Sequence, residues 1–320
     1  GPLVSVDRPR PSPGAHEVLV RVSACGVCRT DLHVAEGDLD VRRPNVVPGH
    51  EVVGYVEELG EDCKRFNVGD RVGIAWLRST CGKCRFCERG DANLCVDPLF
   101  TGWDEDGGYA EFAVAPEAYT YSLKDGVDDV HAAPLLCAGI IGYRALKRAA
   151  VPERGVLGIY GFGGSAHIAM QVAIHQGARV HVMTRSEKAQ RLAIELGAAS
   201  ASGALDRPTE PLDAAILFAP AGEVVPVALT ALDRGGTLSI AGIHLTDVPS
   251  LDYRDHLFYE RTVTSVTANT LEDGREFMEL ALRIPVQTSV QTYSLREADK
   301  VLIDLAHGRV GGAAVLVNDV

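Results

Sequence analysis

Long apolar runs and an excess of basic residues are both missing from this chain of 320 residues. No apolar stretch approaches the roughly 20 residues that a membrane-spanning helix needs, so we expect no membrane partner. The 31 Lys and Arg residues against 43 Asp and Glu give a formal net charge of −12. General binding to a phosphate backbone relies on a basic surface, and we therefore expect no nucleic-acid partner.

Cysteine is too scarce for a secreted scaffold held together by disulfides, with eight residues in the whole chain. The first residues also lack the basic segment and apolar segment of a signal peptide, so we expect reduced thiols and a cytoplasmic location. The 46% hydrophobic and 23% charged residues are close to the globular average, which excludes disordered, collagenous and coiled-coil proteins. The length predicts about two domains.

Two halves of different character follow one another along the sequence. Residues 18–22, 52–56 and 71–75 are short β-rich runs separated by Gly and Pro, which predicts a barrel-like or irregular β domain. From Val156 onward, strands alternate with helices in a pattern typical of parallel βαβ units. We expect strands over 156–160, 179–183, 214–218 and 238–241, helices over 165–176, 187–196 and 224–232, and one long helix over 132–146 at the junction.

Four cysteines stand within fifteen positions of a polar loop, in the pattern C-x2-C-x2-C-x7-C. They are Cys81, Cys84, Cys87 and Cys95. Thiolates at this spacing can surround Zn²⁺ tetrahedrally, and four protein ligands leave no open position, which predicts a structural zinc site in loop 81–95. An iron–sulfur cluster is the alternative, because it uses related spacings, and four free thiols would be an oxidation hazard.

Three further motifs are separated along the chain: Cys25-Gly-Val-Cys28 continuing to His33, Gly49-His50-Glu51, and Leu135-Leu136-Cys137. Together with the four-cysteine loop and a Gly-rich turn, and in the same order, they resemble the zinc-containing alcohol dehydrogenase family of the medium-chain dehydrogenase/reductase superfamily. The resemblance covers nearly the whole chain. It implies an α/β protein with a GroES-like β-rich catalytic domain and a Rossmann-fold (doubly wound parallel sheet) cofactor-binding domain.

The resemblance also assigns roles around a catalytic zinc. Cys28, His50 and Cys137 would bind the ion and leave one position for water or substrate, as a Lewis-acid site requires. By the same resemblance Asp31 orients His50, Glu51 lies close behind the metal, Thr30 hydrogen-bonds the substrate oxygen, and His33 passes the proton to solvent. Cys25 and Cys63 are left as ordinary thiols.

The expected strand 156–160 runs into a Gly-rich turn of the form G-x-G-x-x-A that opens a helix. Its residues are Gly161, Gly163, Gly164, Ser165 and Ala166. Glycines at this turn let a pyrophosphate approach the helix N-terminus, which predicts a dinucleotide site. The resemblance adds Arg29 as a pyrophosphate contact and Gly242, Ile243 and His244 as the backbone segment near the nicotinamide.

The next expected strand ends in Thr184, Arg185 and Ser186, where NAD-dependent enzymes place an acidic residue for the ribose 2′-OH. A hydroxyl, a guanidinium and a second hydroxyl can instead hydrogen-bond a 2′-phosphate. The sequence therefore favours NADP(H) over NAD(H), the alternative being an enzyme that accepts both.

Taken together, these motifs predict an oxidoreductase of the EC 1.1.1 class: a zinc-dependent alcohol dehydrogenase or aldehyde reductase with two zinc ions per chain and NADP(H). It would act on a small alcohol, aldehyde or ketone, with Trp76 and Trp103 as substrate-pocket residues. We expect a catalytic domain over 1–138, a cofactor domain over 139–269 and a returning segment over 270–320. The run 262–267 is the candidate edge strand of a homodimer or homotetramer. The alternatives are a metal-free quinone or enoyl reductase of the same superfamily and a non-enzymatic, zinc-stabilised binding or redox-sensing protein.

Overall fold

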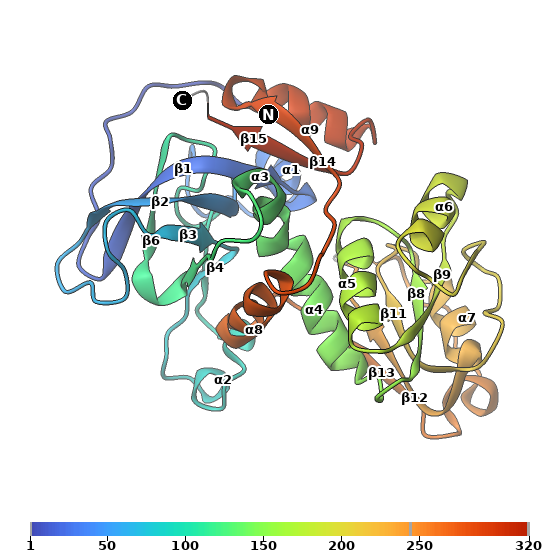
Figure 1. Cartoon of the computed structure of the whole chain (residues 1–320). Helices are drawn as coiled ribbons and strands as arrows, with labels where there is room; N and C mark the ends of the chain where they lie inside the picture. Colours follow the sequence, from blue (N-terminus) through green and yellow to red (C-terminus); the bar gives the residue numbers. More distant parts are fainter. Residues whose placement is uncertain (1, 243–244, 319–320) are drawn as a thin grey trace. The chain divides into compact units, whose positions relative to one another are not determined.

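The computed structural model describes residues 2–242 and 245–318, and the chain separates into two compact units (Figure 1). The first unit consists of Gly1–Cys137 and Ala268–Val320, and the second of Ala138–Thr267. Each unit has its own sheet, described in turn below. All the cysteines predicted to bind metal belong to the first unit, and the Gly-rich turn predicted to bind a dinucleotide belongs to the second.

The first unit is built mainly from strands. They are β1 (Glu17–Val27), β2 (Glu51–Leu59), β3 (Arg71–Ile74), β4 (Leu77–Ser79), β5 (Leu99–Phe100), β6 (Phe112–Pro116), β7 (Thr120–Ser122), β14 (Val290–Ser294) and β15 (Ala313–Val317). A seven-stranded sheet has the order β14-β15-β1-β2-β3-β7, with β6 also paired to β1, and β4 pairs with β5 separately. The helices are α1 (Arg29–Glu36), α2 (Arg85–Glu88), α3 (Asp129–Ala132), α8 (Leu271–Ala281) and α9 (Ala298–Ala306).

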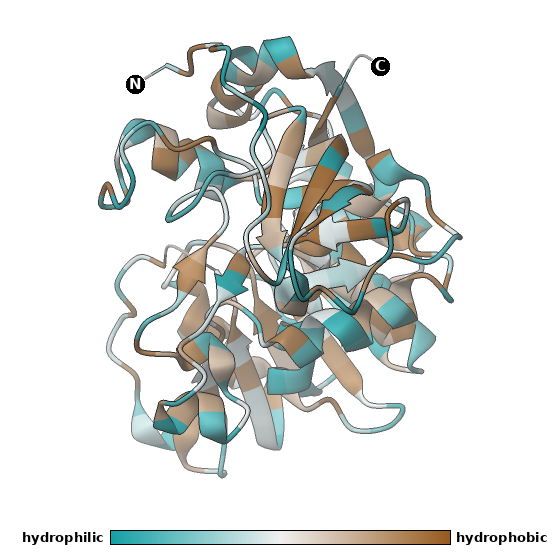
Figure 2. Cartoon of the chain, turned by 90° about the vertical axis from the view of Figure 1, so that its left-hand side faces the viewer, coloured by the Kyte–Doolittle hydropathy of each residue, from teal (hydrophilic) through white to brown (hydrophobic). Residues whose placement is uncertain are grey.

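The core of the first unit follows from the alternation of side chains along its strands. Val18, Val20 and Val22 on β1 pack with Val52 and Val56 on β2, and all five are buried. Because side chains alternate across a sheet, β-branched residues two apart cover one face together. Figure 2 shows hydrophobic stretches along the strands.

The second unit is a six-stranded, fully parallel sheet with helices. Its strands are β8 (Val156–Tyr160), β9 (Arg179–Met183), β10 (Ser200–Ser202), β11 (Leu212–Leu217), β12 (Leu232–Ile240) and β13 (Thr262–Ser265). The order β10-β9-β8-β11-β12-β13 is that of the doubly wound dinucleotide fold. The helices are α4 (Ala138–Ala149), α5 (Gly164–His175), α6 (Glu187–Glu195) and α7 (Val224–Ala231). Every residue of β8 is buried, as expected for a central parallel strand covered on both faces.

The predicted fold class is confirmed by these two sheets, but one predicted element is wrong. The sequence suggested a continuous helix over 132–146. The structure instead ends α3 at Ala132, places a 3-10 turn at Ala133–Leu136 and begins α4 at Ala138. Pro134 cannot donate an amide hydrogen bond, and Cys137 has φ −125° and ψ −72°, outside the helical region. The break places the Cys137 side chain at a bend between two helical segments.

Candidate metal and cofactor sites

A cluster of possible metal ligands forms where β1 and β2 lie side by side. Cys28 follows β1, while His50 and Glu51 stand at the beginning of β2, and the strand register pairs Gly26 with Glu51. The bend at Cys137 adds a second sulfur. One ligand atom from each of Cys28, His50, Glu51 and Cys137 lies within 4.8 Å of all the others. The sequence therefore brings residues from three distant segments to one point.

The geometry of this cluster fits a zinc ion. Two thiolates on one tetrahedral zinc, with Zn–S near 2.3 Å, should lie roughly 3.8 Å apart, and the Sγ atoms of Cys28 and Cys137 are 4.0 Å apart. His50 is fully buried, yet its Nε2 has no hydrogen-bond partner in the described part of the chain. A buried nitrogen without a partner lowers the stability of the folded state. A cation at the cluster would bind this nitrogen and remove that cost.

Asp31 holds His50 in place. His50 Nδ1 lies 3.0 Å from Asp31 Oδ1. Because a carboxylate only accepts hydrogen bonds, Nδ1 carries a proton, and Nε2 is the ring nitrogen left to bind a metal. Asp31 also accepts from the Gly49 N–H at 3.1 Å and from the Cys28 N–H at 2.8 Å. One buried carboxylate thus orients the histidine and the backbone on both sides of the cluster.

Tyr109 completes the environment of Asp31 and was not predicted from the sequence. Its hydroxyl donates to Asp31 Oδ2 at 3.2 Å. Its ring lies where a side chain at Gly49 would be: a Cβ there would come within 2.4 Å of Tyr109 Cδ1, and Gly49 has φ +101°. Burial and the nearby Asp31 carboxylate raise the pKa of Tyr109 well above its ordinary value, so the phenol stays protonated and remains a donor.

The thiols of Cys28 and Cys137 contact each other, and the contact shifts their pKa values in opposite directions. The hydrogen bond from Cys137 lowers the pKa of Cys28 well below its ordinary value, and the same contact raises the pKa of Cys137. Burial raises the pKa of Glu51, with the Cys28 thiolate adding to the effect. A thiolate, a histidine lone pair and a second thiol that ionises on metal binding make up a soft donor set suited to zinc.

The remaining predicted catalytic residues lie on α1. The Thr30 hydroxyl oxygen is 3.7 Å from Cys28 Sγ, so it borders the cluster. His33 lies one turn further along, and its Nδ1 contacts the exposed carboxylate of Asp38 at 2.7 Å. Arg29, the predicted pyrophosphate contact, is exposed at the first position of α1.

The four cysteines of loop 81–95 also converge. One sulfur from each of them lies within 4.8 Å of the others. The Sγ atoms of Cys84 and Cys87 are 3.5 Å apart, as are those of Cys81 and Cys95. Backbone N–H groups of Cys87 and Val96 lower the pKa of Cys84 to about 6, which makes it a thiolate at neutral pH. The spacing again fits tetrahedral zinc.

Cys25 and Cys63 are not members of either cluster. Cys25 is buried on β1 with its Sγ 3.6 Å from the Gly26 carbonyl oxygen, and Cys63 Sγ lies 3.1 Å from the Glu17 carbonyl oxygen. Burial raises the pKa of both thiols. Neither belongs to a group of metal donors among the described residues.

The Gly-rich turn connects β8 to α5 in the second unit. Gly161 has φ +85°, and a Cβ there would lie 2.7 Å from the Ala219 nitrogen, so glycine is required. Gly163 and Gly164 are exposed, and no side chain caps the N-terminus of α5. Ser165 follows them, and Ala166 is fully buried. The uncapped N–H groups at the start of this helix form a site suited to a phosphate.

Strand ends place the other predicted cofactor residues at the same edge of the sheet. Tyr160 is paired with both Met183 and Leu217, and Leu217 with Ile240, so the residues after these strands share one edge. Thr184 is buried there, and Ser186 caps α6 by accepting the Ala189 N–H at 3.3 Å. Arg185 is exposed and makes no hydrogen bond or ion pair within the described residues. Gly242 follows β12, while Ile243 and His244 lie outside the described residues.

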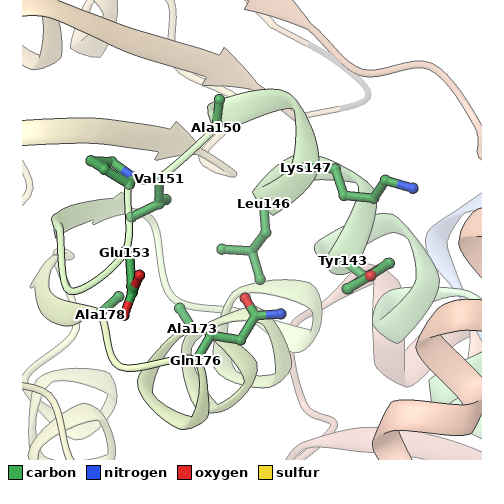
Figure 3. A pocket seen from close by; sticks show the side chains of 10 residues that line it. Tyr143, Leu146, Lys147, Ala150, Val151, Glu153, Ala173, Gln176 and Ala178 are labelled. Atoms are coloured by element: carbon green, nitrogen blue, oxygen red, sulfur yellow. The ribbon is translucent and has the colours of Figure 1, made fainter.

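A cavity of about 230 Å³ opens on the second unit, but at the opposite edge of the sheet (Figure 3). Val151, Pro152 and Ala178, which line it, precede β8 and β9. Ligands of doubly wound sheets bind at the carboxyl ends of the strands, so this cavity is not the dinucleotide site.

Trp76, one of the two predicted pocket residues, lies next to His50, and Trp103, the other, lies next to Trp76. The ring centroids of His50 and Trp76 are 4.9 Å apart with their planes at 70°, and those of the two tryptophans are 5.9 Å apart. Phe100, which no motif in the sequence indicated, stacks on both indoles. All four rings belong to the first unit.

Two family models match the chain. Residues 14–125 match the alcohol dehydrogenase GroES-like domain, and residues 164–283 match the zinc-binding dehydrogenase domain. A protein of Mycobacterium tuberculosis (strain CDC 1551 / Oshkosh), named "Probable alcohol dehydrogenase AdhA", is 58% identical over 99% of this chain and 93% of its own length. No helix among the described residues is long and apolar enough to cross a membrane.

Solved structures show the same fold. A Helicobacter pylori CAD complexed with NADP(H) has a TM-score of 0.85 at 26% identity and covers 95% of this chain and 91% of its own. An acetophenone reductase of Geotrichum candidum NBRC 4597, in complex with NAD, has a TM-score of 0.86 at 26% identity and covers 98% and 93%. The two relatives thus carry different dinucleotides in these structures.

Proposed function

The chain belongs to the zinc-containing alcohol dehydrogenase family of the medium-chain dehydrogenases, and from that premise we propose that it is a zinc-dependent, NADP(H)-preferring alcohol dehydrogenase or aldehyde reductase. Its substrate is a small alcohol, aldehyde or ketone. The observation that carries the proposal is that Cys28, His50 and Cys137 lie together and that the buried Nε2 of His50 has no hydrogen-bond partner among the described residues. The chain also has a Gly-rich turn that opens a helix whose N-terminus no side chain caps.

Cys28, His50 and Cys137 would hold the catalytic zinc, and Glu51 stands next to them as a further donor. When bound there, zinc supplies Lewis acidity for a carbonyl or alkoxide oxygen, and the nicotinamide supplies or accepts the hydride. Asp31 keeps His50 in the tautomer and orientation that a ligand needs. Cys81, Cys84, Cys87 and Cys95 would hold a second, structural zinc, because they offer a closed set of four sulfurs.

Proton transfer is proposed for two side chains of α1. The Thr30 hydroxyl borders the cluster and can donate to or accept from a substrate hydroxyl there. The imidazole of His33 is hydrogen-bonded to exposed Asp38, which supports a role in releasing the proton to solvent.

The preference for NADP(H) rests on Thr184, Arg185 and Ser186. No carboxylate occupies the end of β9, and the Arg185 guanidinium has no partner among the described residues that would compete with a phosphate. A guanidinium can bind a 2′-phosphate with two parallel hydrogen bonds. The turn Gly161–Ala166 and Gly242 would contact the rest of the dinucleotide, and the pyrophosphate contact of Arg29 stays a prediction.

We assign catalysis to the first unit and cofactor binding to the second. The chain would form a homodimer or homotetramer through β13, which pairs only with β12 among the described strands and exposes Val263. Exposed Tyr253, Phe258 and Tyr259 precede it. The cytoplasmic location stays a prediction.

The experiment that tests the proposal is a kinetic screen of aldehydes with NADPH and NADH. We expect NADPH-dependent reduction, with a KM for NADPH below that for NADH, and we expect Arg185→Ala to raise the KM for NADPH about tenfold while leaving that for NADH within twofold. A lower KM for NADH in the wild-type enzyme contradicts the cofactor assignment. Inactivity with every aldehyde while two zinc ions are bound contradicts the enzymatic proposal.

A further inference from the structure

A cavity of about 300 Å³ opens on the first unit, and none of the residues that line it belongs to either cysteine cluster. It is lined by residues of the loop between β2 and β3, of β7 and the turn after it, and of α8. Among the described residues, its lining holds three cations, Arg65, Lys124 and Arg275, and a single acid, Glu279. The lining is thus basic, in a chain whose formal net charge is −12.

Helix α8 is fixed against β7 where it borders this cavity. A Cβ at Gly274 would lie 2.3 Å from the Tyr121 hydroxyl oxygen, so glycine lets the helix pack directly on that ring. Thr270 and Asp273 cap the start of α8 with reciprocal hydrogen bonds of 2.9 and 3.0 Å. Arg275 stands one residue after Gly274, and the backbone that carries it is therefore held in place.

Arg65 is held by Glu117. The Arg65 N–H donates to Glu117 Oε2 at 2.8 Å, the guanidinium donates to the Glu117 carbonyl oxygen, and the guanidinium carbon lies 5.0 Å from the Phe66 ring centroid. Burial and the Arg275 guanidinium lower the pKa of Arg65, and Glu117 raises it by less. The charged side chain with the largest effect on Arg65 is therefore another cation.

The nearby acidic residues leave these cations largely uncompensated. Glu279 forms an ion pair with Arg283, and Glu272 is 3.9 Å from the Arg275 guanidinium, beyond hydrogen-bond distance. The Lys124 ammonium has no ion pair within the part of the chain that the structure describes. Like charges around one cavity repel one another, and an anion bound between them would remove that repulsion.

We propose that this cavity binds a phosphate monoester of a small organic group, with the phosphate held by Arg65, Lys124 and Arg275. A guanidinium binds phosphate with two parallel hydrogen bonds, and a phosphate monoester carries a charge of about −1.5 to −2 at neutral pH, which suits three cations. Tyr121 and Met278, which also line the cavity and are otherwise buried, supply apolar surface for the organic group. The site goes beyond the proposed dehydrogenase function and involves neither zinc nor the dinucleotide turn.

Isothermal titration calorimetry of the zinc-loaded protein with phenyl phosphate tests this site without turnover. NAD⁺ is kept in excess, so that a dinucleotide without a 2′-phosphate occupies the Gly-rich turn. We expect one saturable site with a dissociation constant below about 1 mM. Inorganic phosphate should bind about fivefold more weakly, because it has no apolar group to bury.

Two results with the wild-type protein would contradict the proposal. Absence of saturable binding up to about 10 mM phenyl phosphate overturns the site itself. Inorganic phosphate that binds as tightly as phenyl phosphate overturns the assignment of an ester as the ligand.

Substitution of the cations places the binding in this cavity. Arg275→Gln should raise the dissociation constant for phenyl phosphate about tenfold, because charge-assisted hydrogen bonds are lost. Arg10→Gln is the matched control: Arg10 is an exposed guanidinium of the same unit that lies 4.6 Å over the Phe112 ring, outside the cavity. It should change the constant by less than about twofold. Wild-type binding in Arg275→Gln overturns the proposal.

A variant with the opposite effect excludes a general loss of structure as the cause. Glu279→Gln removes the one acid of the lining and should lower the dissociation constant about threefold, which unfolding could not do. Unchanged or weaker binding in Glu279→Gln contradicts the electrostatic basis of the site. Arg65→Gln should weaken binding about tenfold, as Arg275→Gln does. If Arg65→Gln does not fold, because its contact with the Glu117 carbonyl is lost, the Arg275→Gln result decides.

Discussion

Asp31 is the residue on which the geometry of the candidate zinc cluster depends most. Its two oxygens accept from His50, Gly49, Cys28 and Tyr109, so one side chain fixes a ligand, its preceding backbone and the N-terminus of α1. The sequence pointed to Asp31 by family resemblance. Tyr109 could not be found in the same way, because a tyrosine far along the chain gives no local signal of the carboxylate it contacts.

Removing the Tyr109 hydroxyl should loosen this arrangement without changing any ligand. We expect Tyr109→Phe to weaken zinc binding at the cluster by about tenfold, the lower end of the range for residues outside the ligand set. Competition with a chelator measures the affinity. Tyr119→Phe, which removes a hydroxyl 2.7 Å from Thr80 Oγ1, is the control and should have no effect. A Tyr109→Phe protein with wild-type affinity would show that the hydroxyl does not support the site.

The Thr30 hydroxyl gives a second prediction about a single residue. Because its hydroxyl borders the cluster without belonging to the donor set, Thr30→Ala should nearly abolish turnover while the zinc content stays constant. His33→Gln should lower the rate less, since water can replace the imidazole. Metal analysis alongside initial rates measures both effects. Unchanged turnover in Thr30→Ala removes this hydroxyl from the proton path.

At the scale of elements, strands and helices whose apolar residues recur with a clear period could be predicted from the sequence, whereas the bend at Cys137 could not. The strand over 156–160 and the parallel order of the second sheet follow from short runs of buried, mostly apolar residues that alternate with helices and Gly turns. The apolar stretch 132–146 has helical composition throughout, and only the structure shows the break at Cys137. Pro134 was the available signal, but a proline in a first turn is also compatible with a continuing helix.

Glu117 holds the loop between β2 and β3 through its side chain and gives a pH-dependent prediction. Its Oε2 accepts the N–H groups of Lys64 and Arg65 at 2.9 and 2.8 Å. Burial acts to raise the pKa of Glu117, but these N–H groups outweigh it, and the pKa is lowered. The contribution to stability is therefore complete above the ordinary carboxyl pKa of about 4.3 and is lost as the pH falls through the lower folded value.

Glu117→Gln should accordingly reduce the free energy of unfolding by about 1 kcal/mol at neutral pH, because a neutral acceptor replaces a charged one. The difference from the wild-type protein should shrink below about pH 4. Urea unfolding at both pH values measures it, with exposed Glu58→Gln as the control. A difference that stays constant with pH would mean that the charge of Glu117 contributes nothing.

At the scale of the whole molecule, two independent sheets carry two sets of chemistry-bearing residues. The first unit gathers both cysteine clusters and the rings of Trp76, Phe100 and Trp103, and the second carries the Gly-rich turn and the strand edge with Arg185. Residue spacing alone was enough to predict the four-cysteine loop, because its members lie within fifteen positions. The dispersed cluster spans residues 28 to 137, so only family resemblance or a structure could join its members.

The central claim is that the chain holds a catalytic zinc distinct from a structural one. It is tested most directly by the zinc content of the purified protein, measured together with NADPH-dependent aldehyde reduction, in the wild type and in Cys137→Ser. We predict two zinc ions per chain in the active wild-type protein, and one zinc ion with no reduction in the variant. One zinc ion in an active wild-type protein, or full activity in Cys137→Ser, would contradict the account.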